Sequence, residues 1–129
     1  MKKEVGLWID HREAFLVTLT DNMEELNRIY SKIEVDAQFS GVSRSAGSQE
    51  AENIQDRKYL NNLEKYYDVV IGYIRDADSI LIFGPGEAKG ELAKSLKNKN
   101  LSQHIVSIET SDKLTEPQIA AKVREYFPR

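Results

Sequence analysis

The chain has 129 residues, of which 40% are hydrophobic and 30% charged, and its formal net charge is −3. This length suits one domain with a substantial core, and the mild negative charge excludes a global attraction to nucleic acid. The absence of cysteine excludes disulfides, thiolate metal sites and a cysteine nucleophile. The sequence shows no signal peptide and no apolar segment long enough to cross a bilayer. We therefore expect one domain over residues 1–129, located in the cytoplasm and without membrane contact.

Residues 1–36 predict three strands. Apolar runs over Val5–Ile9 and Ala14–Leu19 flank the short polar segment Asp10–Glu13, which predicts a β-hairpin. Asn27–Asp36 alternates apolar and polar residues with a period of two, which is typical of a strand with one solvated face. The polar segment Asp21–Glu25 predicts the turn before this third strand.

Gln38–Gln55 differs in composition from the segments around it. It is rich in Ser, Gly, Ala, Gln and Glu and has almost no apolar residue that could anchor it. Little burial would offset the entropy lost on ordering such a segment. We therefore expect Gln38–Gln55 to form a mobile loop, and loops of this length in compact domains are usually functional or disordered.

Three helices and a further strand are expected after this loop. Asp56–Asp78 carries apolar and aromatic residues at helical spacing, so it predicts the longest helix, with its tyrosines in the core rather than stacked on bases. Glu87–Asn98 predicts a second helix and Gln103–Glu109 another strand. Thr115–Tyr126 predicts the last helix, because it opens with an N-cap Thr, an early Pro and Gln118 in the capping-box position.

The segment between the first two helices is the most informative one. Ile80–Phe83 is a run of four apolar residues, which predicts a strand buried on both faces. Gly84 and Gly86 permit backbone conformations that side chains oppose, and Pro85 presets its own φ, so a tight strand-to-helix corner is expected. In an open sheet such a corner is a usual place for function. A purely structural turn explains the same residues equally well.

The glycine spacing at this corner does not match a nucleotide-binding motif. Gly84, Gly86 and Gly90 leave one residue too many for the dinucleotide fingerprint, and Glu91 stands where a P-loop needs Ser or Thr. Glu87 at the start of the helix would also repel a phosphate. No nucleotide and no other cofactor is therefore expected.

The predicted order of elements, βββαβαβα, is the ribonuclease H-like order. With right-handed crossovers it predicts an α/β fold, a five-stranded mixed sheet with Ile80–Phe83 central and helices on both faces. A two-metal nuclease would need an acid where this strand ends in Gly84, so Asp10 is interpreted as a turn residue. His11 and His104 are the only histidines, too few for a metal centre, and no metal site is expected.

Two parts of the sequence resemble known proteins. The order of elements, the segment Ile80–Leu92 (ILIFGPGEAKGEL) and the loop before the long helix resemble the middle domain of archaeal and eukaryotic release factors and of Pelota. The ending Val106–Phe127 is similar to small single-domain bacterial relatives often labelled translational-machinery-like. The resemblance implies a ribonuclease H-like fold and a translation-related role.

The loop before the long helix departs from the release-factor pattern. Release factors carry Gly-Gly-Gln there, which reaches the peptidyl-transferase centre and promotes ester hydrolysis, whereas this chain has Ala46, Gly47, Ser48 and Gln49. Pelota also lacks the motif and does not hydrolyse peptidyl-tRNA. The resemblance thus implies a non-catalytic, translation-factor-related module that associates with the ribosome or RNA. Two alternatives stay open: a peptidyl-tRNA hydrolase with Gln49 as its catalytic residue, and a generic protein-interaction domain.

Contacts to RNA or another ligand are expected at the loop, at the glycine corner and on the second helix. Lys97 and Lys99 would extend a basic side of that helix, although a solvated helix face explains them as well. The residues predicted to bind the ligand are Arg44, Gly84, Pro85, Gly86, Lys89 and Lys94.

Overall fold

The computed structural model describes residues 2–31 and 49–128, with the side chains of the second range described from residue 61 onward. A short 3-10 helix, Ser102–His104, precedes the last strand. In chain order the other elements are β1 (Glu4–Ile9), β2 (Glu13–Leu19), β3 (Glu24–Tyr30), α2 (Gln49–Ile74), β4 (Ser79–Gly84), α3 (Ala88–Asn98), β5 (Ile105–Thr110) and α4 (Glu116–Tyr126).

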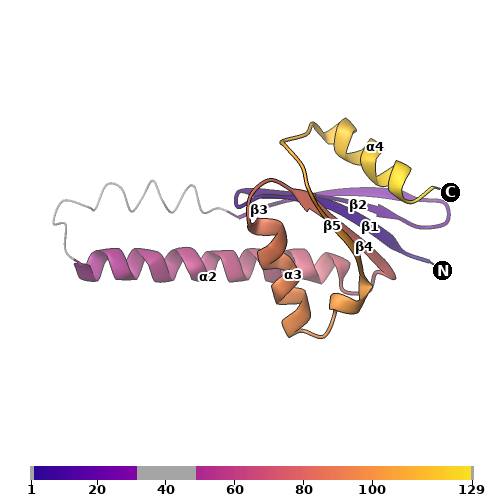
Figure 1. Cartoon of the computed structure of the whole chain (residues 1–129). Coiled ribbons are helices and arrows are strands. Elements are labelled where there is room, and N and C mark those ends of the chain that lie inside the picture. Colours follow the sequence, from indigo (N-terminus) through magenta and orange to yellow (C-terminus); the bar gives the residue numbers. More distant parts are fainter. Residues whose placement is uncertain (1, 32–48, 129) are drawn as a thin grey trace.

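The strands form one five-stranded mixed sheet in the order β3-β2-β1-β4-β5. β2 runs antiparallel to both β1 and β3, whereas β4 runs parallel to both β1 and β5. α2 and α3 cover one face and α4 covers the other (Figure 1). The predicted ribonuclease H-like α/β fold is therefore confirmed. β4 lies in the sheet interior as expected, although the middle strand is β1.

The alternation along β4 explains why its apolar run is continuous. Ile80 and Ile82 belong to the cluster under α2 and α3, whereas Leu81 and Phe83 belong to the cluster under α4. All four side chains are fully buried, because each face of this strand is covered by a helical layer. The sheet thus separates two hydrophobic cores, and Trp8 of β1 lies in the α4 core.

Helix α4 packs closely on the sheet because β1 contains a glycine at the point of contact. A Cβ atom at Gly6 would lie 2.3 Å from Cγ2 of Val123, far inside van der Waals contact. The predicted capping box of α4 is present: Thr115 Oγ1 accepts from the N–H of Gln118, and Gln118 Oε1 accepts from the N–H of Thr115. These reciprocal bonds satisfy two amide groups at the start of the helix.

Several expected boundaries were wrong. β3 ends at Tyr30 rather than Asp36, α2 ends at Ile74 rather than Asp78, and β5 begins at Ile105 rather than Gln103, after the short 3-10 helix. β3 begins at Glu24 rather than Asn27, because a tight turn closes with Thr20 N–H bonded to Met23 O at 3.0 Å and pairing with β2 starts at once. α2 begins at Gln49 rather than Asp56, so part of the segment expected as a loop is helical. Gln, Glu and Ala are strong helix formers, and a helix can continue through them without an apolar stripe. Residues 32–48, including the rest of that segment, lie outside the described residues.

Replacing Gly6 with Ala should destabilise the protein by about 1–3 kcal/mol, because the new methyl group would displace Val123 and with it α4. Gly72→Ala is the matched control: no atom lies within 4 Å of its added Cβ, and it stabilises the helix interior by roughly 0.5–1 kcal/mol. Urea unfolding followed by the fluorescence of Trp8 measures both changes. Shifts of the same sign in the two variants would show that close packing at Gly6 is not required.

Candidate functional site

The carboxyl ends of β1 and β4 bring two loops to the same edge of the sheet. These parallel neighbours are in register from Glu4 opposite Ser79 to Trp8 opposite Phe83. β1 continues into the tight turn Asp10–Arg12, and β4 continues into the Gly84-Pro85-Gly86 corner that leads to α3. The edge of an open sheet beyond its strand ends is where ligands commonly bind in α/β proteins. We take this edge as the candidate site.

Each glycine of the corner is required for a different reason. Gly84 has φ 153°, and a Cβ atom there would lie 2.2 Å from the carbonyl oxygen of Ile9. Gly86 has φ 63°, in the left-handed region, but the space around it is open. Gly84 therefore permits the close approach of two backbones, whereas Gly86 is needed only because its φ lies in the left-handed region. Pro85 between them is half-buried.

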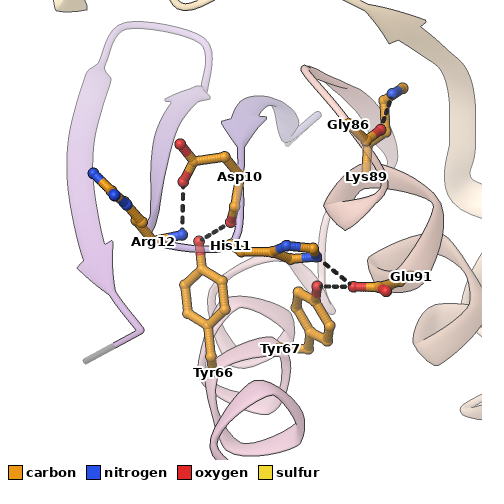
Figure 2. A network of polar contacts seen from close by, with 8 residues as sticks. All are labelled: Asp10, His11, Arg12, Tyr66, Tyr67, Gly86, Lys89 and Glu91. Atoms are coloured by element: carbon orange, nitrogen blue, oxygen red, sulfur yellow. Dashed lines mark hydrogen bonds and ion pairs between the residues drawn. The ribbon is translucent and has the colours of Figure 1, made fainter. Parts of the chain in front are cut away.

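The predicted ligand-binding lysines do not lie together. The Lys89 ammonium group donates a hydrogen bond to the Gly86 carbonyl, so this side chain folds back onto the corner (Figure 2). Lys94 is exposed, and five residues at about 100° each place it well around α3 from Lys89. Lys97 lies between the two in helical angle, while Lys99 forms an ion pair with Asp68 of α2 at 3.4 Å. The predicted basic side of α3 is thus divided.

A polar cluster beside the corner joins three elements of the fold. Glu91 of α3 accepts hydrogen bonds on one carboxylate oxygen from the Tyr67 hydroxyl, at 2.6 Å, and from Nε2 of His11, at 2.8 Å (Figure 2). Tyr67 comes from α2 and His11 from the β1–β2 turn. Because a carboxylate is a strong acceptor, this arrangement holds His11 with Nε2–H as the donor. We name these three side chains the His11 cluster.

The neighbouring residue of α2 contacts the turn itself. The Tyr66 hydroxyl donates to the carbonyl oxygen of Asp10 at 3.0 Å, and Asp10 Oδ1 accepts from the N–H groups of Arg12 and Glu13, each at 2.8 Å. Asp10 is therefore the turn residue that its position predicted. Burial, followed by the negative charge of Asp10, raises the pKa of the Tyr66 hydroxyl far above its usual range. Both tyrosines are buried, as expected for core rather than base-stacking residues.

The His11 cluster has no signature in the sequence. His11 and Glu91 are separated by 80 residues, and His11 and Tyr67 are on different elements, so no spacing rule relates them. Only the parallel pairing of β1 with β4, together with the packing of α2 under both, brings them together. Within the described part of the chain, no group of three or more His, Asp or Glu residues could hold a metal ion.

Of the two candidates from the loop region expected before the long helix, the structure describes only one. Arg44 is outside the described residues, and Gln49 is the first residue of α2, with its side chain outside the described set. Figure 1 shows that the N-terminal part of α2 projects beyond the sheet. Tyr66 is 17 positions after Gln49, which corresponds to roughly 25 Å along the helix axis. A single small ligand cannot contact Gln49 and the glycine corner together, whereas an extended one can.

The fold is similar to that of an archaeal translation termination factor and of two Pelota proteins. An archaeal translation termination factor, aRF1, superimposes with a TM-score of 0.61 at 10% identity, covering 98% of this chain and 35% of that protein. Pelota from Archaeoglobus fulgidus gives a TM-score of 0.55 at 12% identity, covering 98% and 31% of the two chains. Pelota from Thermoplasma acidophilum gives 0.50 at 14%, covering 96% and 32%.

These likenesses establish the predicted resemblance at the level of fold. The chain spans about a third of the length of the solved proteins that it resembles. No protein-family model and no curated protein sequence matches it. Among the residues that the structure describes, no helix combines the length and the apolar character needed to cross a bilayer.

Gly84→Ala should destabilise the protein more than Gly86→Ala, because the added Cβ meets the Ile9 backbone in the first case and open space in the second. Gly86→Ala should cost about 1–2 kcal/mol, the usual penalty for placing a side chain in the left-handed region. Urea unfolding of both variants measures the difference. An equal cost at the two positions would contradict the role assigned to the contact with Ile9.

Tyr66 should make stability fall at high pH. The raised pKa keeps its proton in the folded protein, whereas an unfolded tyrosine loses it near pH 10, so the contribution is present below about pH 10 and lost above it. Between about pH 10 and 11 the free energy of unfolding should therefore decline by up to ~1.4 kcal/mol per pH unit more in the wild type than in Tyr66→Phe.

The control for this pH series is Tyr73→Phe, since Tyr73 is on the same helix but 45% exposed. Comparing the two variants separates the effect of the buried hydroxyl from the effect of removing any tyrosine from α2. If Tyr66→Phe keeps the wild-type slope, the buried hydroxyl is not the group responsible.

Proposed function

We propose that this chain is a non-catalytic, translation-factor-related module that associates with the ribosome through RNA contacts. The observation that carries the proposal is the similarity of nearly the whole chain to domains of aRF1 and Pelota, the first of them a translation termination factor. We also propose that residues 1–129 act as a single unit in the cytoplasm, without a nucleotide or metal cofactor.

The geometry supports a large, elongated ligand. α2 projects from the sheet at one end and is fastened at its other end by the hydrogen bonds of Tyr66 and Tyr67. The tip of α2 and the glycine corner thus lie well apart on the same domain (Figure 1). An RNA segment is long enough to contact both, and phosphate contacts by exposed lysines of α3 would add affinity that depends on salt.

The lysines best placed for such contacts differ from those expected from the sequence. Lys89 closes the corner through its hydrogen bond to Gly86, so its loss would alter the backbone there as well as the charge. Lys94 and Lys97 are exposed and lie three residues apart on α3, and they share one side of that helix. We assign RNA contact to this pair, with Arg44 and the corner residues Gly84, Pro85 and Gly86 as further candidates.

A peptidyl-tRNA hydrolase is the alternative function, and one observation favours it. Gln49 begins the projecting end of α2, which is the position from which a glutamine could reach into a distant catalytic centre. The residues before it lack the paired glycines whose backbone freedom the release-factor motif provides. We therefore rank hydrolysis below simple association.

The double variant Lys94→Glu/Lys97→Glu should weaken ribosome association by at least about tenfold, and it should lower the slope of log K against log salt by about 2, one for each lost phosphate contact. Co-sedimentation with purified ribosomes at several salt concentrations provides the measurement. The matched control is Lys2→Glu/Lys113→Glu, which makes the same change in charge at two exposed lysines outside α3. Binding that both double variants weaken equally would reflect net charge alone and would contradict the assignment.

Gln49→Ala separates association from hydrolysis. If the module is non-catalytic, the variant should bind ribosomes as the wild type does, and neither protein should release the peptide from peptidyl-tRNA in a single-turnover assay. Release by the wild type that drops steeply in Gln49→Ala would replace the main proposal with the catalytic one.

A further inference from the structure

β5 forms an open edge of the sheet, and its backbone groups point outward at defined residues. The N–H of Ser111 donates to the carbonyl oxygen of Gly84 at 3.0 Å, so this position faces β4. Because N–H and C=O groups alternate in direction along a strand, those of Thr110 and Ile108 point away from β4. Within residues 2–31 and 49–128, no strand pairs with this edge.

The same edge carries exposed apolar side chains. Val106 and Ile108 are 47% and 45% exposed. Ile108 pairs with Ile82, whose side chain lies on the α3 face, so Ile108 lies on that face too. Natural edge strands are commonly protected by lysines or prolines, but the only charged residue of β5 is Glu109, which is paired with Lys122 of α4 at 3.0 Å. β5 is therefore suited to strand addition.

Helix α3 places positive charge next to this edge. Glu91 marks the flank of α3 that faces α2 and the β1–β2 turn. Lys89 and Lys97 lie on the opposite flank by helical angle, on the side of β5, and Figure 2 shows Lys89 pointing away from the His11 cluster. Ala93, which is half-buried and small, lies between the two lysines by helical angle.

We propose that β5 accepts an added strand from an extended, acidic segment of a partner protein, whose carboxylates face Lys89 and Lys97. Backbone hydrogen bonds to Ile108 and Thr110 would supply affinity, the exposed side chain of Ile108 would supply apolar contact, and the lysines would select for charge. This surface shares Lys97 with the Lys94–Lys97 pair to which RNA contact is assigned, whereas its backbone contacts at Ile108 and Thr110 belong to β5.

The charges favour this partner over a second copy of the chain. Two β5 strands paired about a twofold axis perpendicular to the sheet would bring both α3 helices to the same face, with their lysine flanks opposed. Such like-charge opposition is unfavourable. The phosphates of a nucleic acid could contact the lysines, but a nucleic acid has no peptide backbone to form the β-sheet hydrogen bonds at Ile108 and Thr110.

The test uses the full chain and a fluorescein-labelled ten-residue peptide that alternates Val and Glu. Fluorescence anisotropy should show saturable binding of this peptide and none of the counterpart that alternates Val and Lys. Two N-methylated versions of the peptide test the backbone pairing, one methylated at every Val and one at every Glu. Only one row of peptide N–H groups faces β5, so one version should lose binding and the other should keep it.

Matched variants locate the contact. Ile108→Asp should weaken binding of the Val/Glu peptide at least about tenfold. Leu26→Asp should change it less than about twofold, since Leu26 is 49% exposed on β3, the other edge strand, and receives the same new charge. Thermal unfolding of both variants verifies that each remains folded.

Several results would overturn the proposal. They are the absence of Val/Glu peptide binding, an equal loss of peptide affinity in Ile108→Asp and Leu26→Asp, and unchanged binding of both N-methylated peptides. A wild-type dimer in sedimentation that dissociates in Ile108→Asp would assign the edge to a second copy instead. Binding of labelled oligouridylate that displaces the peptide and survives Ile108→Asp would assign the surface to RNA.

Discussion

The close approach of two backbones at the carboxyl ends of β1 and β4 is the constraint on which the candidate site depends. Gly84 lies against the carbonyl of Ile9 with no room for a side chain. β4 ends there, the chain turns at the corner, and α3 begins four residues beyond Gly84, at Ala88. The position of Glu91 one turn into α3 follows, and with it the meeting of Glu91 with His11 and Tyr67.

The His11 cluster and the Tyr66 hydrogen bond together fasten α2 at one end only. The helix is long, and its C-terminal half is buried under β1 and β4 while its N-terminal part projects beyond the sheet. A projecting helix keeps a fixed direction relative to the sheet only if the end that packs on the sheet is held firmly. Two adjacent tyrosines, each bonded to a different loop, provide that rigidity through directional contacts in addition to apolar packing.

The opposite face of the sheet is organised by a different contact. Gly6 lets Val123 of α4 approach β1, and the Arg124 guanidinium bonds both carboxylate oxygens of Glu24 on β3, at 2.6 and 2.7 Å. α4 thereby covers the sheet from β1 toward β3. β3 and β5 are the two edge strands of the sheet. β3 carries Glu24, Glu25 and Arg28, whereas the only charged residue of β5 is Glu109, so the edge of β5 is the better suited to a protein partner.

The sequence by itself determined the class of fold and the local geometry of its corner. The four-residue apolar run of β4, the glycines on either side of Pro85 and the capping box of α4 are local signals, because burial on two faces, positive φ and helix capping act within a few residues. The start of α2 was misplaced for the same reason: apolar periodicity detects only the part of a helix that carries an apolar stripe, and the sequence just after Gln49 has no such stripe.

Tertiary structure alone decided which side chains meet. His11 and Glu91 are brought together by strand pairing across 80 residues of sequence, and the Lys89 side chain is turned back onto the Gly86 carbonyl. The lysines of α3 were divided between two sides because helical angle and the packing of Leu92 and Leu96, not sequence proximity, set their directions. Such contacts depend on the register and packing of elements far apart in the chain, and no local pattern encodes that information.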